Sequence, residues 1–282
     1  MKKFFSVGFV ILLYLIIYYG FQSIYLVIAT AYYYVSDANF QQLDIIDWLN
    51  KKLPTAIIFA AFISFLVYAW IVKASKKDNI FSYCRFKTLP LNKVFILIFT
   101  GLSLVSLNGL TVVIISLIFP DAYDAHVESM MGLTSSGGWL MVFSVGIAAP
   151  FIEEVMFRGL ITKELDRVMS YKWVIFIQAL LFGLYHMNLV QGIYTFVLAI
   201  FMGYTLYWTK SIWAPLIIHI VNNLSSVIMS EYLDPNSDIL NIGFGVWMIF
   251  SLVFVLPYGL KYLYRSRVQD SVIEFSEETY QI

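Results

Sequence analysis

Six polar residues in apolar segments of this chain could carry chemistry. Glu153, Glu154 and Arg158 interrupt the hydrophobic stretch 146–161. A charge at bilayer depth costs at least ~2.5–3.5 kcal/mol. Three charges within six residues of an oily segment therefore indicate either a functional site or tight mutual pairing.

The other three polar residues lie further along the chain. His186 ends the stretch Phe182-Gly-Leu-Tyr-His186, and His219 precedes Asn223 by four residues. Residues four apart share one face of a helix. A single buried histidine fits a packing role, but histidines beside a buried carboxylate indicate function.

The spacing of the charged residues predicts two different roles for the two glutamates. Glu154 and Arg158 are four apart and can pair, whereas Glu153 lies about 100° further around the helix and can face a different cavity. Pro150 removes a backbone hydrogen bond one turn earlier and predicts a kink. A structural Glu154–Arg158 pair that locks helix packing is an alternative interpretation, but it leaves Glu153 unexplained.

Glutamate, histidine and asparagine side chains could together hydrolyse a bond with an activated water, without a nucleophilic side chain. A carboxylate can act as general base on water, and imidazole or amide groups can hold that water or stabilise an oxyanion. Glu153, His186 and His219 also match a catalytic zinc ligand set that leaves one position open for water. The sequence leaves open whether Glu153 is the base or a metal ligand.

The elements that position these residues are predicted to be transmembrane helices. The chain has 282 residues, 60% hydrophobic and 13% charged, whereas soluble domains carry about 25% charge. We expect an all-α, polytopic transmembrane bundle, since long apolar runs approach the ~20 residues that span a bilayer. The eight predicted helices are 5–35, 53–75, 92–119, 139–163, 171–188, 191–209, 211–230 and 241–264.

Charge distribution predicts the orientation. With these spans, 16 of the 18 Lys and Arg residues fall on one side, and only Lys51 and Lys52 fall on the other. Both termini are therefore expected in the cytoplasm. The polar stretch 120–137 becomes an acidic outer loop, in which His126 is expected to be solvated. Counting residues from the cytoplasmic edge places Glu153 and His219 at similar depth, which permits one site near mid-membrane that opens to the cytoplasm.

The organisation is expected to be a single membrane domain, 1–282. It divides into helices without a motif (1–138), a core with the candidate catalytic residues (139–230), and a last helix with an acidic tail (231–282), whose residues Glu274 to Glu278 are expected to be disordered. The formal net charge is zero, so nothing suggests nucleic-acid binding. A lone cysteine, Cys84, excludes an intrachain disulfide.

The motifs resemble those of the CPBP family, the CAAX proteases and bacteriocin-processing enzymes, which include type II CAAX prenyl endopeptidases. The family pattern is EExxxR, FxxxH and HxxxN, each on its own transmembrane helix. This chain matches it in order with Glu153-Glu154-x-x-x-Arg158, Phe182-x-x-x-His186 and His219-x-x-x-Asn223. The resemblance covers about residues 140–226.

The resemblance implies an intramembrane endopeptidase of a bacterial cell membrane, with a cavity open to the cytoplasm. By position, Glu153 would activate water, supported by Glu154 and Arg158. His186 would bind water or metal, and His219 with Asn223 would bind metal or stabilise the oxyanion. Zn²⁺ is the expected metal, with Glu153, His186 and His219 as its ligands. The expected partner is a membrane-associated protein or peptide substrate; the oligomeric state is not indicated.

Other interpretations fit the sequence less well. The His-Glu-x-x-His of site-2 proteases is absent, no Asp lies deep in a predicted span, and Ser136-Gly137-Gly138 falls in a predicted outer loop rather than a rhomboid-like setting. A non-catalytic scaffold or bacteriocin-immunity protein could keep the same residues for packing. A transporter is disfavoured because no repeat relates the two halves of the chain.

Overall fold

The computed structural model describes residues 2–36, 44–134, 137–232 and 237–269. In this part of the chain the protein consists of helices joined by short loops. The α-helices are α1 (Lys2–Ser36), α2 (Asp44–Ile71), α3 (Ile80–Tyr83), α4 (Leu91–Ile118), α5 (Pro120–Thr134), α6 (Gly138–Phe143), α7 (Ala149–Glu154), α8 (Thr162–Leu165), α9 (Tyr171–Tyr185), α10 (Leu189–Thr209), α11 (Trp213–Tyr232), α12 (Asp238–Phe250) and α13 (Leu256–Arg265). Four π-helical segments continue or join these helices: Val72–Lys76, Ser144–Ala148, Val155–Ile161 and Ser251–Val255.

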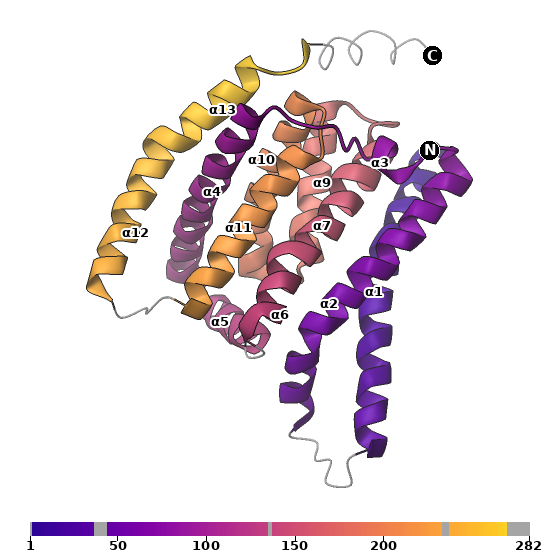
Figure 1. The fold of residues 1–282 in the computed structure, drawn as a ribbon, viewed down its shortest axis with the longest axis horizontal. Helices are drawn as coiled ribbons and strands as arrows, with labels where there is room; N and C mark the ends of the chain where they lie inside the picture. The colour runs from indigo at the N-terminus through magenta and orange to yellow at the C-terminus, as the bar shows by residue number, and fades with distance from the viewer. Residues whose placement is uncertain (1, 37–43, 135–136, 233–236, 270–282) are drawn as a thin grey trace.

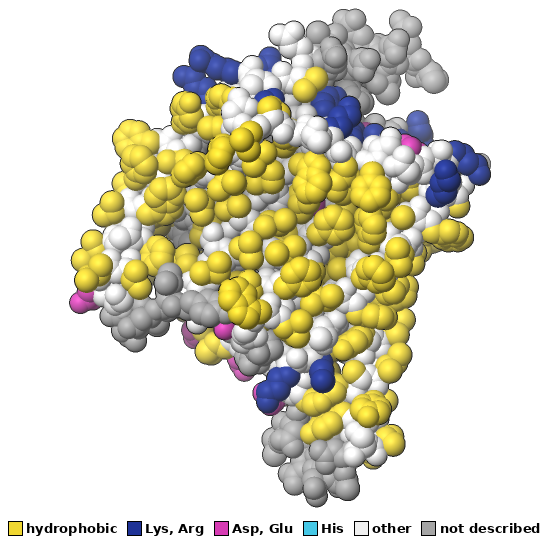
Figure 2. Space-filling view, viewed as in Figure 1, with side chains coloured by type: hydrophobic (Ala, Val, Ile, Leu, Met, Phe, Trp, Pro, Cys, Tyr) yellow, Lys and Arg dark blue, Asp and Glu magenta, His cyan; other side chains and the backbone are white. Residues whose placement is uncertain are grey.

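The predicted all-α polytopic bundle is confirmed. Within the described residues, 7 continuous helical segments are long and apolar enough to cross a membrane, and α9 is a shorter apolar helix. Helices α6, α7 and α8 and the π segments between them form one such span, 138–165. A broad hydrophobic belt covers the face in Figure 2, as expected for a surface that meets lipid.

The two ends of the bundle differ in charge. The start of α1 and the end of α13 lie at the same end, with α3, and most Lys and Arg in view gather there (Figures 1 and 2). Acidic side chains, with a smaller basic group, lie at the opposite end, near α5 and the starts of α2 and α12. We call these the basic end and the acidic end. The acidic tail lies outside the described residues.

The main hydrophobic core fills the half of the bundle toward the basic end. Every residue of the π segment Val155–Ile161 is buried there. The buried Tyr68 hydroxyl donates to the Tyr14 carbonyl oxygen over 2.6 Å and so ties α2 to α1. Glu164, fully buried, binds Lys76 at 2.5 Å and also pairs with Arg167. This half of the molecule is therefore densely packed.

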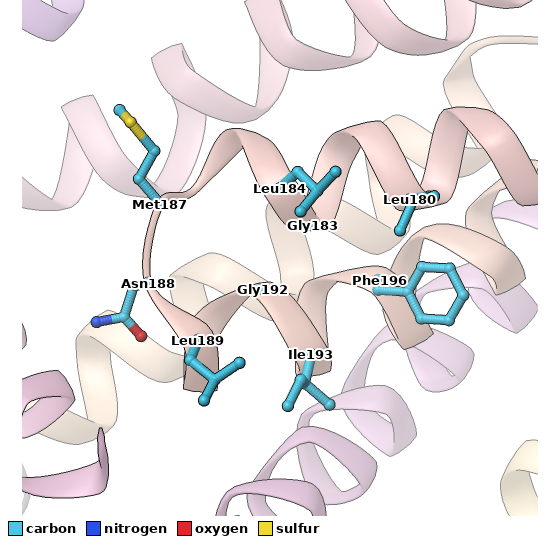
Figure 3. A pocket seen from close by; sticks show the side chains of 9 residues that line it. All are labelled: Leu180, Gly183, Leu184, Met187, Asn188, Leu189, Gly192, Ile193 and Phe196. Carbon is cyan, nitrogen blue, oxygen red and sulfur yellow. The ribbon is translucent and has the colours of Figure 1, made fainter. Parts of the chain in front are cut away.

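Helices α9 and α10 form an antiparallel hairpin that is shorter than expected. The predicted helix 171–188 ends at Tyr185, and the chain turns at Met187, which has a positive φ of 50°. Gly183 and Gly192 let the two backbones approach, since a Cβ on Gly183 would lie 2.6 Å from the Gly192 carbonyl oxygen. An apolar groove of about 370 Å³ runs over this contact (Figure 3) and contains no ionisable side chain.

Helix α5 corrects the prediction for residues 120–137. This stretch was expected to be an outer loop because it is polar, but residues 120–134 are helical and pack against α4, α10 and α2. The expectation for His126 was also wrong, because its side chain is buried and lies edge-on to Tyr194. Burial lowers the pKa of His126 and favours its neutral form. Tertiary packing has overridden the polar pattern.

The close contact of α9 and α10 generates a prediction. Gly183→Ala is expected to destabilise the protein by about 1–3 kcal/mol, because the new methyl group meets backbone that cannot move aside. Gly243→Ala, in α12, is the matched control: it has open space around it and should stabilise the helix by up to about 1 kcal/mol. Thermal unfolding in detergent measures both. Equal midpoints for the two variants would contradict the proposed packing.

Candidate active site

The two glutamates lie on a helix whose winding changes on either side of them. Glu153 and Glu154 end α7, between the π segments Ser144–Ala148 and Val155–Ile161. Single π turns inside α-helices are rare and occur frequently at functional sites. In the second π segment the Thr162 hydroxyl donates to the Phe157 carbonyl oxygen over 2.8 Å. The widened turns set which side chains of this helix face the interior.

Glu154 is the centre of a buried polar network. Its Oε1 accepts from Arg158 Nη1 at 2.9 Å and from His219 Nδ1 at 2.8 Å. The side chains of Glu154 and Arg158 are fully buried. The Arg158 guanidinium also lies 4.5 Å from the centre of the Phe182 ring, a cation–π contact. This network binds the motif helix to α9 and α11.

Glu153 faces a different environment, as predicted. Among the described residues, Arg158 pairs with Glu154 rather than with Glu153. Glu153 Oε2 lies 3.7 Å from His219 Nε2, beyond direct hydrogen-bond range. The Glu154 carboxylate accepts the Nδ1 proton of His219, so the other ring nitrogen, Nε2, faces Glu153. Glu153 is thus the carboxylate of the pair that stays free of the packing network.

His186 follows the last residue of α9 and is held by its own backbone. Its Nδ1 lies 2.8 Å from the Phe182 carbonyl oxygen, which can only accept, so Nδ1 carries the proton and Nε2 is left free. The Phe182 ring contacts both imidazoles edge-on, with centroids 4.9 Å from His186 and 5.6 Å from His219. Phe182 therefore acts as a shared wall that sets the spacing of the two histidines.

Asn223 is positioned through Pro150. Proline has no N–H, and the N–H of Ala149 binds the Ser144 carbonyl. Neither donor reaches the Val145 carbonyl, which instead accepts from Asn223 Nδ2 over 3.0 Å. Pro150 thus lies directly after a π turn, and the carbonyl that it leaves without a backbone donor ties Asn223 of α11 to the motif helix.

Sequence reasoning missed several residues near the site. Asn108 in α4 donates to Asn222 Oδ1 over 3.3 Å, and both side chains are buried. Tyr185 has a buried hydroxyl without a hydrogen-bond partner in the described structure, and its ring packs against those of Tyr18 and Tyr19. A lone Asn within span 92–119 was a usable signal for Asn108. Nothing in the sequence pattern connects the tyrosines of α1 with Tyr185.

Two cavities meet at the candidate residues. One of about 800 Å³ is lined by Glu153, and one of about 730 Å³ by His219; His186 and Asn223 line both. The three motif helices therefore bring the acid, both imidazoles and the amide to one place, as predicted. Both cavities extend toward the acidic end, where they reach α5. The cytoplasmic position of the basic end and the opening of the site to the cytoplasm both stay predictions, but they do not agree with each other, because the cavities reach the opposite end.

The predicted zinc site requires three ligands, Glu153, His186 and His219, around one ion. No three His, Cys, Asp or Glu side chains among the described residues are arranged to hold a metal ion. Glu153 and His219 approach each other, but His186 does not complete a three-residue set with them. The residues in this arrangement therefore do not fit the expected three-ligand zinc centre, and no step proposed below passes through a metal.

Comparison with known proteins matches the segment that carries this geometry. The model of the family described as Type II CAAX prenyl endopeptidase Rce1-like matches residues 135–225, which contain all three motifs. No curated protein and no solved structure matches the chain. The segment of this chain that holds Glu153, His186 and His219 is therefore similar to the type II CAAX prenyl endopeptidases, which are CAAX-type proteases of the CPBP family.

Proposed function

We propose that this integral membrane protein is an endopeptidase that hydrolyses a peptide bond of a membrane-associated protein or peptide with a glutamate-activated water. The family match supports an intramembrane protease in general. The specific support for the mechanism is Glu153: it has a free carboxylate, borders a cavity large enough for a peptide segment, and lies 3.7 Å from His219 Nε2.

Glu153 is the general base in this mechanism. It takes a proton from water as the water oxygen attacks the carbonyl carbon, and it later returns that proton to the leaving amine. Glu154 does not suit this role, because it lines neither cavity: its Oε1 accepts from Arg158 and His219, and its Oε2 is buried. Its role is to position His219.

One imidazole orients the attacking water. The hydrogen bonds at Nδ1 leave the Nε2 lone pairs of His186 and His219 available. Because the water has two hydrogens and one of them goes to Glu153, a single Nε2 accepts the other. The developing oxyanion instead needs donors. Asn223 has a second amide hydrogen beyond the one given to Val145. Tyr185 lines the same cavity, and its buried hydroxyl has no partner in the described structure.

A non-catalytic scaffold is the rival function. It would explain the Glu154–Arg158–His219 network, which ties three helices together. It would not explain why a second carboxylate, Glu153, lines a cavity of about 800 Å³ while Arg158 pairs with Glu154 instead. The rival predicts that Glu153 can be replaced without consequence.

Replacing Glu153 tests the proposal directly. Glu153→Gln is expected to lower cleavage by about 10²–10⁴-fold, because the general base is lost, while thermal stability stays near wild type. Glu164→Gln is the contrasting control on the same span: it breaks a buried ionic cluster with Lys76 and Arg167 away from both cavities, and should reduce stability. Peptide profiling of the membrane and secreted fractions measures cleavage. An unchanged profile in the Glu153 variant would favour the scaffold.

The buried pair gives a second prediction, this time about stability. Arg158→Leu should cost about 3–5 kcal/mol, because it leaves the Glu154 carboxylate buried without its arginine partner and with only His219 bound to it. Combining it with Glu154→Leu should recover much of the loss, since two apolar side chains replace the ion pair. The double variant should remain inactive because His219 loses its acceptor. A double variant that is stable and cleaves normally would remove Glu154 from the mechanism.

Metal removal gives a third prediction. The described side chains do not form a three-ligand metal group, so we expect cleavage by the purified protein to survive exhaustive treatment with chelators. Elemental analysis of wild type and Glu153→Gln, run in parallel, shows whether metal is bound in either. Loss of cleavage on chelation, with recovery on adding zinc, would instead show that His186 joins Glu153 and His219 around an ion.

A further inference from the structure

The cavities at the site reach the surface at only one end of the bundle, as judged from their linings. The Glu153 cavity is bordered by exposed residues of α5 and of the start of α2, among them Ser129, Glu128 and Ile46. The His219 cavity is bordered by exposed Ser226 and Ser230 near the end of α11. All of these positions lie in the half of the molecule toward the acidic end.

The other end is closed by packing. Between Glu154 and the basic end, every residue of Val155–Ile161 is buried. The loop after α3 seals this region from outside, since a Cβ on Gly159 would lie 2.5 Å from Cys84 Sγ. The buried carboxylate of Glu164, held by Lys76, completes the closure. Among the described residues, these contacts separate Glu154 from the basic end.

The charge bias assigns the two ends to the two sides of the membrane. Of the 18 Lys and Arg residues, 16 fall on the side of the basic end when the spans are placed in order. Lys and Arg near span ends stay in the cytoplasm. The acidic end, with α5 and the openings of both cavities, is then the outer side.

We propose that the site acts on polypeptide segments presented on the extracytoplasmic side of the membrane. The inference rests on the proposed endopeptidase activity and names the side and type of its substrate. Because His186 and Asn223 line both cavities, a segment at the site has room for one flank in each. Such a segment must be extended, because the water activated by Glu153 has to reach a backbone carbonyl carbon, and the turns of a helix would enclose that carbon.

The lining also limits the charge of the substrate. Neither lining set contains a Lys or Arg, whereas Glu128 and Glu153 both border the larger cavity. An acidic segment would meet like charge in a poorly hydrated space, which is unfavourable. The structure thus favours neutral or basic extracytoplasmic segments.

Cysteine accessibility in intact cells tests the proposal. Single variants Ser129→Cys, at the opening, and Gln191→Cys, which borders both cavities, are probed with a membrane-impermeant maleimide. Ser75→Cys, exposed near the basic end, is the matched control. Native Cys84 can stay, because burial raises the pKa of its thiol to about 12 and keeps it unreactive.

We expect Ser129→Cys and Gln191→Cys to be labelled equally in intact and permeabilised cells, and Ser75→Cys only after permeabilisation. Labelling of Gln191→Cys only after permeabilisation, or in neither condition, would overturn the proposal. So would labelling of Ser75→Cys from outside, which would mean that the bundle is inverted.

Two further readouts separate this proposal from the proposed function. The labelling pattern should persist in the Glu153→Gln background, because accessibility does not depend on catalysis. External modification of the Gln191→Cys variant should also stop substrate cleavage; cleavage that continues would overturn the extracytoplasmic route. A third outcome combines labelling from outside with a peptide profile that Glu153→Gln leaves unchanged. This outcome would contradict the proposed enzymatic activity but not the extracytoplasmic opening.

Discussion

The arrangement of the site depends on one carboxylate oxygen. Glu154 Oε1 accepts from both Arg158 and His219 inside a dry core. Removing any member leaves a charge or a donor buried without a partner, which is far more costly than the net gain from forming the bond. This network therefore fixes the relative position of the motif helix and α11, and the geometry of the other site residues follows from it.

The same constraint divides the work between two neighbouring residues. Glu154 is committed to structure, so Glu153, about 100° further around the helix, is left for chemistry. Phe182 extends the division to the histidines: its ring contacts both imidazoles and the Arg158 guanidinium. The whole molecule shows the same contrast between packing and chemistry. The half toward the basic end is densely packed, and the half toward the acidic end contains the cavities.

Sequence reasoning predicted the helical bundle and the residues of the site because both depend on local pattern. The spacing of Glu154 and Arg158 predicted their pairing, and apolar runs predicted the spans to within a few residues, except that α2 begins at Asp44 rather than near 53. What failed depends on tertiary packing. Helix α5 is polar in sequence, and only its neighbours make His126 a buried residue.

The direction of the opening was also beyond the sequence. Counting residues from the cytoplasmic edge placed Glu153 and His219 at similar depth, but depth does not tell which side of the site is filled with side chains. That depends on contacts between distant segments, such as Cys84 against Gly159. The π turns were hidden for a related reason, because a pattern read with 3.6 residues per turn contains no signal for an extra residue.

The π turns make the motif span sensitive to length. Each α-helical residue adds a rotation of about 100°, so losing one residue from Ser144–Ala148 would swing the segment before it around the axis relative to Glu153 and separate the Val145 carbonyl from Asn223. Substitutions in this segment are limited only by the size and polarity of the side chain. An insertion or deletion between the start of the span and Glu153 would instead disrupt the site.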